Sequence, residues 1–156
     1  MRPGTHEIFP NIWIPPLLAT DSLNEARMNE DVQNIINLKM KSYSMSFAWT
    51  KIYGANGLMN PGNIAQYIVL LQKLKENNIE VVGTLESWDL PDEFFQSGKQ
   101  GWAEDETVDR FLTYGKACYT QFYQYVDRWI PITNIEKSIF LGYANHNYPP
   151  ASFENK

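Results

Sequence analysis

The sequence holds one cysteine, Cys118, and two histidines, His6 and His146. A single cysteine excludes an intramolecular disulfide framework, and we expect Cys118 to act as a small buried hydrophobe. The two histidines are far apart and lack the spacing of metal ligands. We therefore expect no metal site and no cofactor.

Positive charge is also scarce, with 13 Lys and Arg against 18 Asp and Glu and a net charge of -5. No basic stripe is present, so nucleic-acid binding is not expected. The apolar stretch 12–19 is short and interrupted by Pro15 and Pro16, which favours neither a signal peptide nor a membrane span. The absence of an Asn-x-Ser/Thr sequon favours a cytoplasmic location.

The chain does contain a regular alternation of strand-like and helical patterns, as in an α/β protein with a parallel sheet. The expected strands lie at 12–20, at 43–49, around 81–85 and from about residue 130. Asn60 and Pro61 predict the start of the second helix, and Asp105 predicts the cap of the third.

Three apolar stripes at helical spacing support these helices. Their members are Val32, Ile35, Ile36 and Met40 in the first helix, Ile64, Tyr67, Ile68, Leu71 and Leu74 in the second, and Val108, Phe111, Leu112, Cys118, Tyr119 and Phe122 in the third.

Two motifs are more specific. Residues 84–91 read Thr-Leu-Glu-Ser-Trp-Asp-Leu-Pro, and residues 129–143 read Trp-Ile-Pro-Ile-Thr-Asn-Ile-Glu-Lys-Ser-Ile-Phe-Leu-Gly-Tyr. They resemble glycoside hydrolase family 1, whose pattern is Thr-Leu-Tyr-His-Trp-Asp-Leu-Pro, then Trp-x-Thr-x-Asn-Glu-Pro and Leu-Gly-Tyr. Residues 19–24 and 43–49 are similar to two earlier motifs of that family. The resemblance implies a partial (β/α)₈ TIM barrel, about the first four strand-helix units, in one truncated domain spanning 1–156.

The same resemblance implies a degenerate sugar site. At the positions of this site the sequence has Asn24 where the family has a Gln, Ser44 where it has an Arg, Ser87 where it has a His, and Thr133 where it has an Asn. Trp88 is retained. Asn134 stands where the family has the Glu that serves as general acid and base. An amide has no proton to give a leaving alkoxide near neutral pH, so Asn134 cannot do that work. The family takes its nucleophile from the seventh strand, which this sequence does not contain.

We therefore expect a catalytically inactive pseudoenzyme that binds a carbohydrate or a protein. Klotho-type proteins of the family are similar in carrying Asn at the acid/base position. The alternative is a β-glycosidase that hydrolyses O-glycosyl bonds as a fragment, or after assembly with a missing half. Glu136 would then replace the missing acid, because residues two apart on a strand point to the same side and Glu136 lies two residues after Asn134. The favoured interpretation is that Glu136 is a solvated side chain.

Two other groups of side chains could be assigned a role in catalysis or sugar binding. Glu86 and Asp89 are not expected to form a catalytic pair, because Glu86 and Ser87 face opposite ways on a strand. Trp49, Trp88 and Trp129 could stack on sugars, but packing is the favoured role.

A half barrel leaves inner side chains uncovered, here expected to include Val82, Thr84 and Ile132. This predicts a homodimer, a barrel-completing protein partner or a flattened open sheet. A truncated product of a longer gene is a further possibility.

Overall fold

The structure is a computed structural model that describes residues 25–53, 57–87 and 90–145. Three parallel strands form one sheet in the order β1-β2-β3. They are β1 (Ser42–Ser46), β2 (Glu80–Glu86) and β3 (Arg128–Ile132). The α/β class is confirmed, and the arrangement is that of part of a (β/α)₈ barrel. The strand expected at 12–20 lies outside the described residues.

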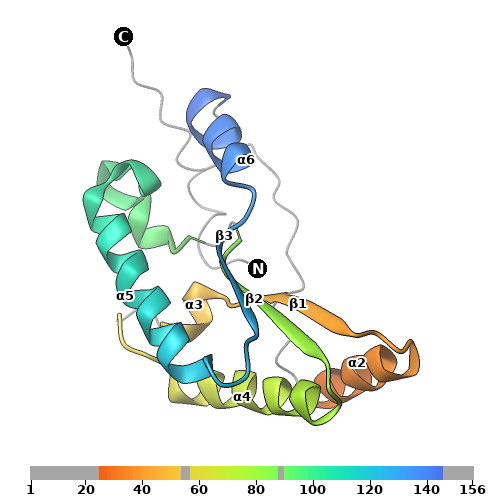
Figure 1. Ribbon diagram of the computed structural model, residues 1–156. Helices are drawn as coiled ribbons and strands as arrows, with labels where there is room; N and C mark the ends of the chain where they lie inside the picture. Colours follow the sequence, from red (N-terminus) through yellow and green to blue (C-terminus); the bar gives the residue numbers. More distant parts are fainter. Residues whose placement is uncertain (1–24, 54–56, 88–89, 146–156) are drawn as a thin grey trace.

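Three long helices accompany the strands. Helix α2 (Glu25–Asn37) precedes β1, α4 (Pro61–Glu76) connects β1 to β2, and α5 (Asp105–Phe122) connects β2 to β3. Figure 1 shows all three on the same side of the sheet. The short elements are α3 (Trp49–Ile52), the 3₁₀ turns η2 (Asp92–Phe94), η3 (Gln96–Gly98) and η4 (Gly101–Ala103), helix α6 (Ile135–Ile139) and the π-helical turn η5 (Phe140–Ala144).

The predicted ends of α4 are confirmed. The Asn60 side chain accepts a hydrogen bond from the Asn63 N–H at 3.1 Å, and Pro61 opens the helix. Asn77 is the C-terminal cap, and Asn78 follows with a φ of 55°, the left-handed conformation that Asn tolerates.

The other two helices differ from expectation at their ends. Helix α2 ends at Asn37 and Lys39 turns the chain with a φ of 55°, so Met40 lies beyond the helix and is exposed. The expected strand 43–49 stops at Ser46, and Trp49 instead begins α3. A turn at Lys39 and a new helix at Trp49 therefore override the apolar pattern at these two places.

The expected cap and stripe of α5 are also partly wrong. Glu104 holds the cap position in place of Asp105, and its side chain makes no capping hydrogen bond. Val108, Leu112 and Tyr119 are 42%, 63% and 57% exposed, because the helix rests on the sheet through a neighbouring set of side chains. The buried residues of α5 are Thr107, Tyr114, Cys118 and Phe122.

The core between sheet and helices is aromatic. Phe47 stacks on Phe122 with ring centroids 4.7 Å apart. Gly83 of β2 makes room for it, because a Cβ there would lie 2.8 Å from Phe47 Cε2. The Tyr114 hydroxyl lies 2.9 Å from the Phe47 carbonyl oxygen and 3.0 Å from that of Leu85. One buried phenol thus ties α5 to the ends of two strands.

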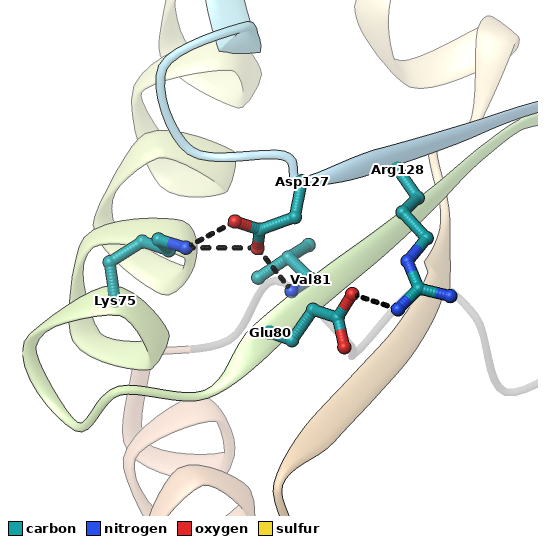
Figure 2. Close-up of polar contacts among 5 residues, drawn as sticks. All are labelled: Lys75, Glu80, Val81, Asp127 and Arg128. Atoms are coloured by element: carbon teal, nitrogen blue, oxygen red, sulfur yellow. Dashed lines mark hydrogen bonds and ion pairs between the residues drawn. The ribbon is translucent and has the colours of Figure 1, made fainter.

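A polar cluster fixes the amino end of the sheet (Figure 2). Lys75 Nζ lies 2.7 and 2.9 Å from the two carboxylate oxygens of Asp127, and Asp127 Oδ2 accepts a hydrogen bond from the Val81 N–H at 2.7 Å. Beside it, Arg128 pairs with Glu80 at 2.6 Å. The start of β3 is therefore held against both β2 and α4.

Partial burial pushes the pKa of the Asp127 carboxyl upward, but the hydrogen bonds from Lys75 and Val81 outweigh it and hold the pKa below its ordinary value. A carboxyl with a lowered folded-state pKa contributes stability above its unfolded pKa. That contribution is lost as pH falls through the folded pKa.

We expect Gly83→Ala to destabilise the fold by about 1–3 kcal/mol, because the new methyl group would overpack against Phe47 and Val126. Chemical denaturation measures the free energy of unfolding. Gly62→Ala is the matched control, since its Cβ would lie 3.4 Å from the exposed Asn60 side chain and the change should be neutral or stabilising. Equal effects of the two substitutions would contradict the packing described for Phe47.

We expect Asp127→Ala to lower stability at neutral pH by about 1–2 kcal/mol, because the Val81 N–H loses its carboxylate acceptor. Glu80→Ala, which removes only a solvent-exposed ion pair, should change stability by less than about 1 kcal/mol. Denaturation from pH 7 to pH 2 provides the test. The deficit of Asp127→Ala should shrink as pH falls through the lowered pKa of the wild-type carboxyl, and a deficit that does not depend on pH would contradict the role of the carboxylate.

Candidate functional site

The two faces of the sheet have different surroundings. Val81 is fully buried, Gly83 lies against Phe47, and a Cβ on Gly115 of α5 would touch Leu85 at 3.3 Å. These β2 residues therefore face the helices. Because side chains alternate along a strand, the residues between them face the opposite side, here called the inner face.

The strand register identifies the members of the inner face. Ser46, Thr84 and Ile130 lie side by side across the three strands, and Glu86 pairs with Ile132. The inner position expected for Thr84 and Ile132 is confirmed.

Val82 pairs with Ser44 and Arg128 on the same face, as expected. The expectation that these side chains are uncovered holds only in part. Val82 and Ile132 are half-buried, whereas Thr84 is only 4% exposed.

The carboxyl ends of the strands are joined by backbone hydrogen bonds. Phe47 N–H donates to the Thr84 carbonyl at 2.8 Å, and Thr133 N–H donates to the Glu86 carbonyl at 3.0 Å. The Thr133 hydroxyl oxygen lies 3.4 Å from the same Glu86 carbonyl. Thr133 is thus brought to the end of β2, where Ser87 follows the last strand residue. This edge of the sheet is the candidate functional site.

Asn134 marks the point where β3 gives way to α6. Its backbone is left-handed, with φ 55° and ψ 35°, and its carbonyl accepts hydrogen bonds from Lys137 and Ser138 at 3.0 and 3.1 Å. The side chain is exposed and makes no capping hydrogen bond to α6. An exposed amide can donate and accept hydrogen bonds but carries no titratable proton.

Strand alternation from Asn134 does not place Glu136 on the inner face, as the glycosidase alternative had required. Glu136 lies in the first turn of α6, so strand alternation from Asn134 does not apply. Its side chain is exposed. Glu136 is thus a solvent-exposed carboxylate in a helix, where the sequence favoured a loop.

Glu86 is the residue that sequence reasoning undervalued. Its side chain is 2% exposed and lies on the inner face at the carboxyl end of β2. Counting alternate residues from Thr84 would have placed it there. Asp89, the carboxylate that was not expected to form a catalytic pair with Glu86, lies outside the described residues. Asn24 and Trp88 of the expected sugar site lie outside them as well.

The described tryptophans of the expected aromatic rim belong to the packing. Trp49 is 3% exposed and stacks on Tyr114 with ring centroids 4.7 Å apart. Trp129 is half-buried and stacks on Phe47 at 5.6 Å. Both rings lie among the aromatic side chains between sheet and helices, which confirms the packing role favoured for them.

A tyrosine connects the two loops that border the site. The Tyr143 hydroxyl, from η5, donates to the carbonyl oxygen of Gln100 in the loop after β2, at 2.7 Å. Burial raises the pKa of Tyr143, so the phenol remains a donor at neutral pH. Next to Gln100, Gly101 has a φ of 59° and leaves room for Phe95. The segments after β2 and after β3 are therefore fixed to each other.

The described part of the chain offers little for metal chemistry. Within residues 25–53, 57–87 and 90–145, no three His, Cys, Asp or Glu side chains gather in a way that could hold a metal ion. None of the helices described there is both long and apolar enough to cross a membrane.

The arrangement suits hydrogen bonding better than proton transfer. Hydroxyl and amide groups of Ser46, Thr133 and Asn134 lie near the carboxyl ends of the strands, and Glu86 adds a buried carboxylate. Hydroxyl and amide groups match the donors and acceptors of a sugar. Retaining glycoside hydrolysis requires two carboxyl groups about 5–5.5 Å apart across the scissile bond.

Comparison with known proteins gives a consistent result. The profile of the family described as "Glycosyl hydrolase family 1" matches residues 18–156. Beta-glucosidase 4 of Oryza sativa subsp. japonica is 30% identical over 132 residues, covering 83% of this chain and 27% of that protein. Klotho of Homo sapiens is 31% identical over 135 residues, covering 85% of this chain and 13% of that protein.

The solved structures agree. The GH1 beta-glucosidase of Exiguobacterium antarcticum B7 superposes with a TM-score of 0.76 at 32% identity, covering 84% of this chain and 28% of that chain. The chain therefore spans little more than a quarter of the length of the two beta-glucosidases.

The left-handed backbone of Asn134 predicts the cost of restoring an acid at this position. We expect Asn134→Glu to lower stability by about 1 kcal/mol, because Glu lacks the tolerance of Asn for positive φ. Asn134→Gly should be neutral or stabilising, since glycine adopts this conformation freely. Thermal and chemical denaturation compare the three proteins, and a Glu variant as stable as the wild type would contradict the strain assigned to this position.

Proposed function

The chain belongs to glycosyl hydrolase family 1, and we propose that it uses the fold of this family to bind a carbohydrate without hydrolysing it. The observation that carries the proposal is the exposed amide of Asn134 at the position that the family motif gives to the acid/base Glu. General acid catalysis needs a group that can release a proton near neutral pH, and an amide cannot do so.

The surroundings of Asn134 support binding. Thr133 is held at the end of β2 by its backbone hydrogen bond to Glu86, so the two neighbouring polar side chains extend from a fixed strand end. Preorganised donors and acceptors lower the entropic cost of holding a ligand. The candidate ligand is a sugar whose hydroxyl groups exchange hydrogen bonds with the Asn134 amide and the Thr133 hydroxyl.

A second function has support from the relatives. The beta-glucosidase of Exiguobacterium antarcticum has nearly the same fold over the matched region. The alternative is β-glycosidase activity that arises after assembly with further strand-helix units, which would supply a nucleophile. Glu136 of α6 and the buried Glu86 are the carboxylates that this alternative would require near the described strand ends.

An aryl β-glucoside with a good leaving group separates the two functions, because such a substrate needs little acid assistance. We expect the purified chain to release no phenol above the rate of a buffer blank, and Glu136→Gln and Glu86→Gln to leave that result unchanged. Sustained turnover that one of these two substitutions abolishes would favour the glycosidase.

Binding is tested separately by NMR titration with a β-linked glucose disaccharide. We expect shifts of the Thr133 and Asn134 amide signals, and about a tenfold loss of affinity in Asn134→Ala, equivalent to one hydrogen bond of about 1.4 kcal/mol. Asn34→Ala, which removes an exposed amide from α2, is the matched control and should bind like the wild type. Equal affinity of the two variants would contradict the site.

A further inference from the structure

A cavity of about 200 Å³ lies where helices α2 and α4 meet strand β1. All three elements line it, and α2 and α4 also contact each other. The central strand β2 separates β1 from β3, whereas Thr133 and Asn134 of the candidate sugar site follow β3. The cavity is therefore separate from the two residues that carry the proposed function, and what it binds does not depend on that function.

The walls of the cavity are mostly apolar. Met28, Val32 and Ile35 lie on one face of α2, because residues three and four apart in a helix are neighbours. Met45 of β1 and Leu70 of α4 complete the apolar lining. Protein interiors are closely packed and leave few voids larger than a water molecule. An apolar hollow of this size therefore lacks contacts that a ligand would supply.

Two tyrosines add aromatic surface and hydroxyl groups to the lining. The Tyr67 ring is buried, and its hydroxyl oxygen accepts a hydrogen bond from the Ala48 N–H at 3.0 Å. Tyr43 is half-buried, and burial raises its pKa. The negative charge of Asp31 raises the pKa of Tyr43 further, so this charge acts on the wall of the cavity. Neutral aromatic rings of this kind suit a ligand that carries a positive group on an apolar body.

Asp31 gives the cavity a negative charge. It lies on α2, four residues before Ile35, and among the described residues that line the cavity it is the only charged one. The side chains of Asp31 and Ser46 are exposed, so the cavity opens to solvent beside them. None of the ion pairs in the described parts of the chain uses Asp31. A carboxylate at the opening attracts cations and repels anions.

We propose that this cavity binds a small organic cation, with an ammonium group on an apolar body about the size of one aromatic ring. The ammonium group pairs with the Asp31 carboxylate at the opening, and the apolar body occupies the space lined by Val32 and Leu70. The size fits, because an engineered apolar cavity of about 150 Å³ holds benzene. The larger volume of about 200 Å³ leaves room for the charged group. Met28 and Met45 can adjust to the outline of the ligand, since methionine is unbranched and flexible.

The test is NMR titration of the chain with benzylammonium and with benzyl alcohol, which has nearly the same shape and no charge. We expect benzylammonium to bind about tenfold more tightly, as one charge-assisted hydrogen bond implies, and to shift the methyl signals of Met28 and Met45. Asp31→Asn should weaken the binding of benzylammonium about tenfold and leave that of benzyl alcohol unchanged. Glu30→Gln removes the same charge from an exposed position outside the lining, and this matched control should bind benzylammonium like the wild type.

The proposal is overturned if benzylammonium shows no saturable binding, or if the wild type binds benzylammonium and benzyl alcohol equally well. Neither result depends on the folding of a variant. Equal losses in Asp31→Asn and Glu30→Gln would also overturn it, because they would report the net charge of the chain and not one carboxylate. Shifts confined to the Thr133 and Asn134 signals would assign the ligand to the candidate sugar site and overturn the proposal as well.

Discussion

The described structure depends on the packing of Phe47 against a glycine in the central strand. Gly83 allows the Phe47 ring to lie on β2, and Phe122 of α5 stacks on the same ring. This contact gathers the helices on one face of a three-stranded parallel sheet. A parallel sheet is normally buried on both faces. Among the described residues the helices cover one face, and the inner face, where Thr84 and Glu86 are 4% and 2% exposed, leads to the candidate site.

The functional positions follow from that division. Inner-face residues lead to the carboxyl ends of the strands, which is where barrel enzymes place their chemistry. Here those ends carry Thr133 and the amide of Asn134, with the Glu86 carboxylate buried beside them. The family fold positions the site, and the side chains at the strand ends determine its chemistry.

Much of the fold could be predicted from sequence, because local signals and the family motif agreed. The Asn60 and Pro61 start of α4 is a local capping interaction, and the order of strands and helices follows from periodicity. The exposed stripe of α5 could not be predicted, because an apolar pattern does not reveal which flank rests on the sheet. Glu136 was misplaced for a related reason. The left-handed turn at Asn134 ends the strand, and no sequence period encodes it.

The central claim is that this family 1 segment folds around its own core while the edge of β3 that faces away from β2 stays unpaired. Amide hydrogen exchange of the purified chain measures this most directly. We expect slow exchange for Val82 and Ile130, whose N–H groups lie within the two strand pairs, and fast exchange for Trp129, whose N–H faces away from β2. Equally slow exchange at Trp129 and Ile130 in the monomeric chain would contradict it.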